Sequence, residues 1–488
     1  MKFFALFLLT FFCTEMLRAY DLKIDGIYYN IISTEAVEVT FEVFRNSTKE
    51  YNDEIIIPDT IIYDEKIYRV EKIATYAFYY CDGLKSVKIP GSVKKIDNEA
   101  FYHCNNLLSL EFESGFETLL LDRSSFVGCP IHNIYLDRNM SFSSSPFSKT
   151  KTLCSLTIGD NVTKIEDSAF EYCSNLTQVI LPNGLTTIGK NAFAHCQSLK
   201  TLDIPDTVTN IDDMAFYGCI GLILIVLPEG LTKINESTFY NCSSLTSLVI
   251  PESVTEIGRY AFQFCSNLYS IILGKNVQSI GACSFYGCTS LTSVDIPKNV
   301  TEIGSGAFWG CCLLDTMIVP ESIRIIANGV FSGCTNLTSV VLPENLMMIS
   351  DMAFFGCCSL TSITFPENVD EIGSFAFYGC NQLVEICLLS KTPPKPISGN
   401  LFDNEIEQSA ILYVPKDCMA DYLVHPYWGR FAHIIEEDKA THIDTQKILA
   451  KDTDKYIHSI QGQRIITNNM STLPTGIYIV NGKKLFIR

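Results

Sequence analysis

A cysteine recurs every 23 residues from Cys173 to Cys380, without a single slip of register. A fixed period of this length predicts a solenoid, because each repeat forms one unit that cannot bury its apolar face alone. Stacked repeats bury one continuous core, so the period excludes a compact globule with a non-repeating core. The ten positions are Cys173, Cys196, Cys219, Cys242, Cys265, Cys288, Cys311, Cys334, Cys357 and Cys380.

Three further apolar columns keep the same phase. Phenylalanine stands three residues before each of these cysteines, isoleucine eight before and leucine three after. The segment Leu291–Ile296 alternates apolar and polar residues, which predicts a short strand with Val294 and Ile296 pointing inward. Neighbouring strands would be parallel at about 4.8 Å spacing. Earlier units carry Phe78, Phe101, Phe126 and Phe147, which gives 14 units with a phenylalanine.

The repeat motif LxxLxLP…IGxxAFxxCxxL resembles the leucine-rich repeats of the BspA-like class, which is found on bacterial surface proteins. The resemblance covers roughly Ile73 to Leu389. It implies a curved, right-handed, β-rich solenoid with 23-residue units and small β-containing caps, and a role in adhesion or protein binding.

The chain divides into six predicted segments. Alternating and β-branched runs precede the repeats, and a Pro-rich break at Lys391–Pro396 follows them. We expect a signal peptide at 1–19, an N-terminal β cap at 20–72, the repeat solenoid at 73–390, a C-terminal cap at 391–437, a linker at 438–455 and a β-rich tail at 456–488.

The two ends of the chain predict export. Met1–Ala19 has a lysine, an apolar run and small residues near its end, which is typical of a secretory signal; the alternative is a buried N-terminal helix. No later run is long and apolar enough to span a bilayer. The stretch LPTGIYIVNGKK resembles the sorting tail of type IX secretion substrates, with a small accessory β-module as the alternative. The protein is therefore expected to be secreted or held at the outer cell surface.

The charge composition narrows the classes of possible binding partner. The formal net charge is −18, with 54 acidic against 36 basic residues. This disfavours nucleic acid and anionic membrane surfaces as partners, because both bind basic patches on proteins. The expected partners are protein or glycan ligands, among them host extracellular matrix or other cells.

The cysteines have a structural interpretation. Each column cysteine is expected to point inward and pack as a free, small apolar side chain. Cys283, Cys312, Cys358 and Cys387 lie off the column, where any bridge would more readily form. The polar stretch at 138–145 predicts a surface bulge, and the recurring Gly258, Gly281, Gly304 and Gly373 predict turns.

No catalytic constellation stands out. His103 and His195 each precede a column cysteine, so a Cys–His pair is conceivable, but a tolerated side chain at a variable position is the stronger interpretation. Zinc-like CxxC pairs, phosphate-binding loops and GxSxG are absent from the sequence. We therefore predict no enzyme activity, catalytic residue, cofactor or metal.

Two rows on the strands are the candidate binding surface. If Val294 and Ile296 point inward, their neighbours point outward. One row is mainly hydroxylic and the other mainly β-branched; an exposed apolar row fits partner docking, although β-branched residues also simply favour strands. The candidate residues are Val226, Ser247, Val249, Ser270, Ile272, Ser293, Asp295, Thr316, Ile318, Ser339 and Val341.

An aromatic row stands two residues before the cysteines. Aromatic residues are enriched at binding hot spots, but they also pack between successive turns. The candidates are Tyr217, Tyr240, Tyr286, Trp309, Phe355 and Tyr378. These patterns predict a macromolecule-binding surface protein, with a glycan-binding module that uses the aromatic row, or a structural envelope component, as alternatives.

Overall fold

The computed structural model describes residues 20–42, 51–398 and 400–437, and the backbone of four strands within 457–487. The predicted signal peptide at 1–19 and the linker at 438–455 lie outside the described residues. The contacts divide the chain into two units, 1–208 and 209–488, and each is described by itself.

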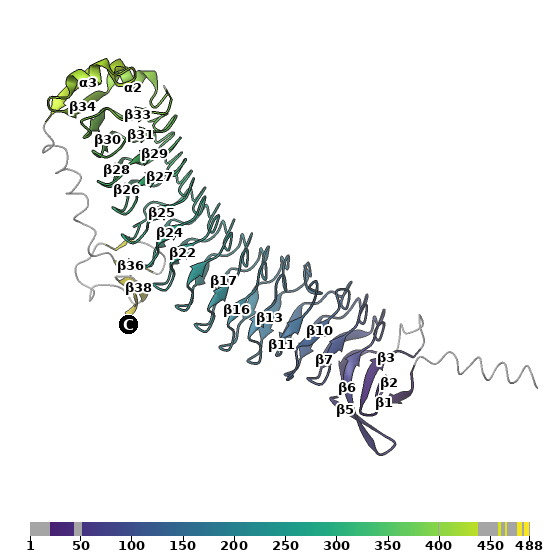
Figure 1. Cartoon of the computed structure of the whole chain (residues 1–488). Helices are drawn as coiled ribbons and strands as arrows, with labels where there is room; N and C mark the ends of the chain where they lie inside the picture. The colour runs from purple at the N-terminus through teal and green to yellow at the C-terminus, as the bar shows by residue number, and fades with distance from the viewer. Residues whose placement is uncertain are drawn as a thin grey trace, which may run out of the picture. The chain divides into compact units, whose positions relative to one another are not determined.

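The first unit is built from short strands on successive turns (Figure 1). The hairpins β1–β2–β3 and β5–β6 are antiparallel, and from β6 onward the strands pair in parallel with the strand one turn away. The strands are β1 (Leu22–Ile24), β2 (Ile27–Ile31), β3 (Ala36–Thr40), β4 (Asp53–Ile56), β5 (Thr60–Tyr63), β6 (Lys66–Ile73), β7 (Leu84–Ile89), β8 (Lys95–Ile96), β9 (Ser109–Phe112), β10 (Leu119–Leu121), β11 (Asn133–Leu136), β12 (Met140–Ser141), β13 (Ser155–Ile158), β14 (Lys164–Ile165), β15 (Gln178–Ile180), β16 (Thr187–Ile188) and β17 (Thr201–Asp203).

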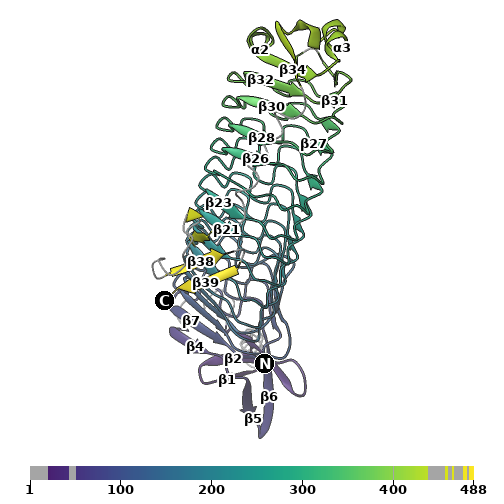
Figure 2. The ribbon, with the colours of Figure 1, turned by 90° about the vertical axis from the view of Figure 1, so that its left-hand side faces the viewer.

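The second unit continues the pattern with two strands in most turns. Figure 2 shows β21, β23, β26, β28, β30, β32 and β34 aligned along one side of this unit. The strands are β18 (Asn210–Ile211), β19 (Leu224–Val226), β20 (Lys233–Ile234), β21 (Ser247–Val249), β22 (Glu256–Ile257), β23 (Ser270–Ile272), β24 (Ser279–Ile280), β25 (Glu302–Ile303), β26 (Thr316–Ile318), β27 (Ile325–Ile326), β28 (Ser339–Val341), β29 (Met348–Ile349), β30 (Ser362–Phe365), β31 (Glu371–Ile372), β32 (Glu385–Leu388), β33 (Lys395–Pro396), β34 (Ile411–Pro415) and β35 (His433–Glu437).

Helices and a separate antiparallel sheet complete the described part of this unit. The helices are α2 (Asn404–Ser409), α3 (Met419–Val424) and the 3-10 helix η1 (Trp428–Arg430). The antiparallel sheet contains β36 (Ile457–Ser459), β37 (Arg464–Ile465), β38 (Gly476–Val480) and β39 (Lys483–Ile487), in the order β37-β36-β38-β39.

The parallel register follows directly from the repeat. Ile234 lies opposite Ile257, Ile257 opposite Ile280, and Ile280 opposite Ile303, so equivalent residues of successive turns form one buried column. The fold is therefore the predicted solenoid. The strand expected at Leu291–Ile296 is the exception, because only Ser293 forms an isolated bridge, to Ser270. Asp295 falls within this segment, and aspartate is a poor strand former.

Phenylalanine rings form the centre of both cores. In the first unit the rings from Phe78 to Phe193 stack in sequence, and in the second the rings from Phe216 to Phe377 do so, with centroids 4.7–6.2 Å apart. Every one of these side chains is at most 3% exposed. Burying an aromatic side chain stabilises a fold by roughly 1.5–3 kcal/mol, so the column carries much of each core's stability.

The stacks reach residues on either side of the predicted repeats. Tyr51 packs against Phe78, with ring centroids 4.8 Å apart. Phe402 stacks on Phe377 at 5.4 Å, which adds a fifteenth phenylalanine that the sequence pattern missed. Trp428 is fully buried beside Phe402, and its indole N–H donates to the Pro394 carbonyl oxygen at 2.7 Å. Large aromatic side chains therefore cover the outermost phenylalanines.

The column cysteines are buried, as expected, and they also form hydrogen bonds. Nine of these ten thiols donate to the carbonyl oxygen of the phenylalanine in the preceding repeat, as Cys265 does to Phe239 at 3.2 Å and Cys334 to Phe308 at 3.3 Å. The same bond joins Cys104 to Phe78 and Cys196 to Phe170 in the first unit. A cysteine therefore fills the core and satisfies a carbonyl that points along the stack.

The predicted surface bulge at 138–145 is right only in part: Ser141, Ser143 and Ser144 are exposed, whereas Arg138 and Ser145 turn inward. Arg138 is 1% exposed, and its guanidinium donates to the carbonyl oxygens of Pro90, Gly91 and Glu117 at 3.3, 3.2 and 2.8 Å. Burial lowers the pKa of Arg138. Glu117 lies in the lengthened turn and Pro90 and Gly91 lie one repeat earlier, so a single guanidinium ties these two turns together.

We expect Arg138→Met to lower the free energy of unfolding by about 3 kcal/mol or more, since three carbonyl groups lose a charged donor. Urea denaturation followed by circular dichroism measures this change. Arg123→Met is the matched control, because Arg123 is exposed and its replacement should stay within about 0.5 kcal/mol. Equal losses in the two variants would show that the buried guanidinium has no structural role.

The recurring glycines Gly258, Gly281, Gly304 and Gly373 stand immediately before turns, as predicted, and the carbonyl oxygens of the first three accept hydrogen bonds from the N–H three residues later. None of them has a positive φ. A Cβ atom at Gly304 would lie 2.4 Å from the backbone nitrogen of Ala282, and at Gly373 2.3 Å from that of Asp351. These glycines therefore allow close backbone approach between stacked turns.

Candidate binding surfaces

The outward side of the second unit's strands carries the two predicted rows. In β26 the central residue Met317 is buried, whereas Thr316 and Ile318 on either side are exposed. Ser293 and Asp295 are also exposed. Six further residues of the two rows are half-buried: Val226, Val249, Ser270, Ile272, Ser339 and Val341.

Ser247 departs from the prediction, because it is only 6% exposed. It lies in β21, whose neighbours in the stack present Leu224 and Ser270 at the same repeat position. A short serine beside a longer leucine is shielded from solvent. The remaining residues form a nearly uncharged strip of hydroxyl and β-branched side chains, which we call the sheet face, with Asp295 as its one charge.

The aromatic row forms a second feature on the same unit. Tyr217 and Tyr240 stack at 4.6 Å with an interplanar angle of 4°, and Phe355 and Tyr378 stack at 5.9 Å and 13°. Tyr286 lies against Trp309 at 5.8 Å. Trp309, Phe355 and Tyr378 are 36–40% exposed. Neighbouring rings therefore cover each other's faces and present mainly their edges to solvent.

Phe264 also belongs to the aromatic row, although it stands one residue after the position that the pattern predicted. Its ring packs edge-on between Tyr240 and Tyr286, with centroids 5.6 and 5.5 Å away. It stands directly before Cys265 and adopts φ = 62°, the left-handed conformation that Gly287 and Gly310 adopt at the same repeat position. A phenylalanine in a slot that favours glycine was the available signal.

The histidines next to column cysteines stack on tyrosine rings of the preceding repeat. The ring of His103 stacks on Tyr80 at 5.2 Å, and that of His195 stacks on Tyr172 at 4.4 Å. Cys104 and Cys196 are completely buried and donate to phenylalanine carbonyl oxygens. The described residues contain no group of three or more His, Cys, Asp and Glu side chains arranged to hold a metal ion.

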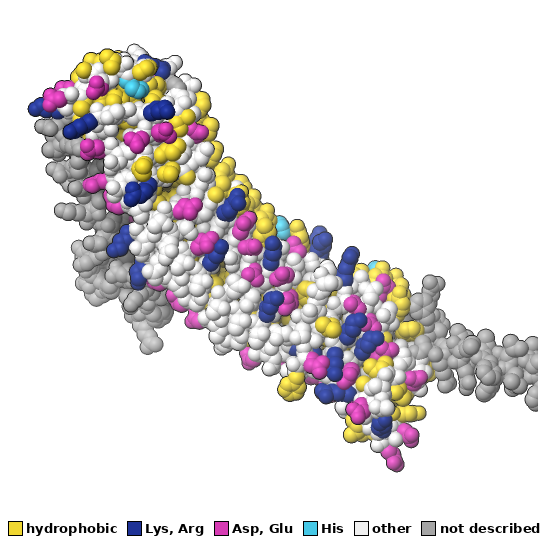
Figure 3. Space-filling model, viewed as in Figure 1, with side chains coloured by type: hydrophobic (Ala, Val, Ile, Leu, Met, Phe, Trp, Pro, Cys, Tyr) yellow, Lys and Arg dark blue, Asp and Glu magenta, His cyan; other side chains and the backbone are white. Residues whose placement is uncertain are grey.

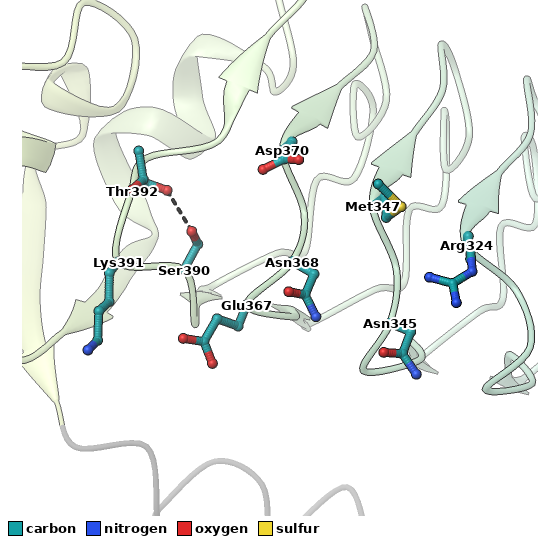
Figure 4. Close-up of a pocket in the computed structure, with 9 residues that line it drawn as sticks. All are labelled: Arg324, Asn345, Met347, Glu367, Asn368, Asp370, Ser390, Lys391 and Thr392. Atoms are coloured by element: carbon teal, nitrogen blue, oxygen red, sulfur yellow. Dashed lines mark hydrogen bonds between the residues drawn. The ribbon is translucent and has the colours of Figure 1, made fainter.

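A groove in the second unit was not anticipated. It has a volume of about 540 Å³ and runs along the turns that precede β27, β29, β31 and β33 (Figure 4). Figure 4 shows side chains from successive turns side by side, with Glu367 and Lys391 pointing to the same side. The lining residues are Arg324, Asn345, Met347, Glu367, Asn368, Asp370, Ser390, Lys391 and Thr392.

The groove residues occupy equivalent positions in successive repeats. Arg324, Met347 and Asp370 are 23 residues apart, and so are Asn345, Asn368 and Lys391. Sequence reasoning could have found the site from its change of residue type, because earlier units carry threonine where Arg324 stands, as at Thr255 and Thr301.

Charge is distributed unevenly along the chain. Figure 3 shows Lys, Arg, Asp and Glu side chains gathered over the first unit near its N-terminal strands. There Lys72 bridges Glu38 and Asp97 at 2.9 and 2.7 Å, and Lys88 bridges Glu111 and Glu113 at 2.9 and 2.7 Å. These charges pair with each other, whereas the sheet face carries almost none.

A family model described as "BspA type Leucine rich repeat region" matches the chain in six copies, with matches at residues 71–200, 140–269, 186–314, 255–384 and 303–413. The protein belongs to the BspA-type leucine-rich repeat family. This confirms the predicted resemblance for the repeats, and the sorting signal at the C-terminus remains a prediction. No curated protein matches the chain.

Solved structures of leucine-rich repeat proteins resemble this BspA-type chain. One from Bacteroides ovatus is 25% identical, with a TM-score of 0.53, and the match covers 86% of this chain and 100% of that one. A leucine-rich cell surface protein from Faecalibacterium prausnitzii is 25% identical over 75% of this chain and 94% of that one, with a TM-score of 0.38. The pneumococcal vaccine antigen PcpA is 18% identical over 86% and 100%, with a TM-score of 0.42. No helix among the described residues has the length and apolar character needed to cross a membrane.

Proposed function

We propose that this BspA-type protein is exported, acts at or outside the cell surface, and binds other proteins through its sheet face. The observation that carries the proposal is the sheet face itself, a strip with a single charge in which β-branched and hydroxyl side chains repeat on the outward side of aligned strands. Exposed apolar strips with few charges are typical of protein interaction sites. A rigid row of equivalent positions would let one partner contact several turns at once.

The location rests on the sequence of the two ends. Met1–Ala19 is typical of a secretory signal, and the C-terminal stretch resembles a type IX sorting tail. The four antiparallel strands β36–β39 are compatible with such a tail and also with an accessory module. We further propose that 20–72 and 391–437 act as caps of the 73–390 solenoid, since Tyr51 and Trp428 cover terminal phenylalanines.

The aromatic row favours packing over glycan binding. A sugar stacks on the open face of an aromatic ring, but Tyr217 and Tyr240 cover each other at 4.6 Å. On the C-terminal side of Trp309, a Cβ atom at Gly329 would lie 3.0 Å from the ring, so this face is also covered. The row therefore supports the neighbouring turns.

The test is a binding screen of the purified protein against immobilised extracellular-matrix proteins, measured by surface plasmon resonance. We expect Ile318→Asp to lower the affinity for any captured partner at least about tenfold, because the substitution places a charge in an apolar interface. Ile325→Asp is the matched control, since Ile325 is 52% exposed in the same turn but lies in β27, away from the sheet face. Absence of binding across the panel, or equal losses in both variants, would contradict the proposal.

A further inference from the structure

Several polar side chains of the groove lack the hydrogen bonds that residues at the equivalent repeat positions form in other turns. In earlier turns of the second unit the hydroxyl groups of Thr255 and Thr301 donate to carbonyl oxygens one turn away, at 3.2 and 3.3 Å. Arg324 and Asp370 occupy the same repeat position. Their side chains form no hydrogen bond or ion pair within the described part of the chain.

The neighbouring column shows the same change. Asn276, Asn299 and Asn368 each donate a side-chain amide hydrogen to a carbonyl oxygen one turn away, at 2.8, 2.9 and 3.1 Å. Asn345 and Lys391 stand at the equivalent position, and their side chains make no such bond among the described residues. Departures from a consistent local rule concentrate at functional sites. Four such departures line one groove, which indicates a binding site.

Geometry explains why the opposite charges do not pair with each other. Arg324 and Asp370 are two turns apart, which corresponds to roughly 10 Å along parallel strands. That separation exceeds the reach of an ion pair but lies within the length of a short ligand. A ligand that spans the turns could contact the guanidinium at one end and the carboxylate at the other.

The types of side chain define the ligand chemistry. Guanidinium groups recognise carboxylates through paired N–H donors, and the Lys391 ammonium adds a second cation. Asp370 accepts hydrogen bonds only, so it requires hydroxyl or amine donors, whereas the Asn345 amide both donates and accepts. A ligand with a carboxylate and many hydroxyl groups satisfies all of these side chains.

The same lining argues against a folded protein or peptide as the occupant. Protein hot spots are centred on buried aromatic or aliphatic anchors. Met347 is the one apolar side chain among the groove residues, and it is 45% exposed. The volume of about 540 Å³ suits a small ligand or a short polymer segment.

We propose that the groove from Arg324 to Thr392 binds a carboxylated oligosaccharide, with Arg324 on the carboxylate and with Asn345 and Asp370 on sugar hydroxyl groups. This site is separate from the sheet face, and the inference does not rest on the proposed protein-binding function.

Isothermal titration calorimetry of the full chain with a uronic-acid trisaccharide tests the proposal. We expect saturable binding, at least about tenfold weaker in Arg324→Gln, because a charge-assisted bidentate contact is lost. Lys298→Gln is the matched control, since it removes an exposed cation from outside the groove lining and should leave the affinity unchanged. Ile318→Asp should also leave it unchanged, which separates this site from the sheet face.

Two further ligands make the outcome decisive. The methyl ester of the same trisaccharide should bind at least about tenfold more weakly, as the carboxylate charge is gone. Hexaglutamate should bind no better than the ester. The proposal is overturned if the acid and its ester bind equally, if Arg324→Gln has the affinity of Lys298→Gln, or if hexaglutamate binds as tightly as the trisaccharide.

Discussion

Replacing Phe354 with alanine is expected to lower the free energy of unfolding by about 3–5 kcal/mol, the usual cost of removing a buried aromatic side chain. Phe354 is fully buried between Phe331 and Phe377, with ring centroids 5.3 and 5.1 Å away. Both neighbours are fixed by their own turns, so the cavity cannot readily collapse. Because each turn contacts only its neighbours, the loss weakens two interfaces at once.

The adjacent residue provides the control. Phe355 is 36% exposed and stacks on Tyr378 at 5.9 Å, so Phe355→Ala should cost less than about 1 kcal/mol. Urea denaturation monitored by circular dichroism compares the two variants at equal protein concentration. If the two substitutions cost the same, the phenylalanine column is not the principal source of core stability.

The second large effect is a loss of stability at alkaline pH. Burial raises the pKa of Cys265 to about 12, and burial likewise raises the pKa of Cys173 to about 12, from a reference value of 9.0. Above pH 9 the unfolded chain releases these protons while the native protein retains them. The native state then binds more protons than the unfolded state, so its stability falls as pH rises from about 9 to about 12. Each thiol contributes about 1.4 kcal/mol per pH unit in that window.

The comparison variant is Cys265→Ser. A serine hydroxyl can still donate to the Phe239 carbonyl oxygen but does not ionise in this range. Unfolding free energies of both proteins are measured at intervals from pH 7 to pH 11. The difference between wild type and variant should stay constant up to about pH 9 and then shift against the wild type. Parallel curves throughout would contradict the assigned burial of the thiol.

The repeat predicted the core because the same apolar residue types recur at the same positions of every unit. The phenylalanine, isoleucine, leucine and cysteine columns all lie inside, as expected, since the same apolar positions of every turn face the core. Phe402 escaped notice because it follows Phe377 by 25 residues and has no column cysteine after it. Arg138 was misplaced for another reason: a polar residue usually lies outside, and nothing in the neighbouring sequence indicated that three carbonyl groups of earlier residues would accept hydrogen bonds from its guanidinium.

The candidate binding surfaces could be predicted only in part, because the exposure of a side chain also depends on residues one turn away. Alternation along the strands predicted the exposure of Thr316 and Ile318, but Ser247 depended on the size of a residue one turn away. The groove arises where Arg324, Asp370 and Lys391 break the columns, and isolated substitutions of this kind resemble ordinary variation between repeats. Only the stacking shows that these three changes meet on one surface.

The one-turn register of the strands has a consequence for how such chains change in length. In β20, β22, β24 and β25 every residue pairs with its counterpart 23 positions away, and no pairing reaches further. Duplication or deletion of one whole unit would therefore present each remaining strand with the same kind of neighbour as before. Descendants could lengthen or shorten their reach by single steps of the solenoid, while the residues that close its ends stay unaltered.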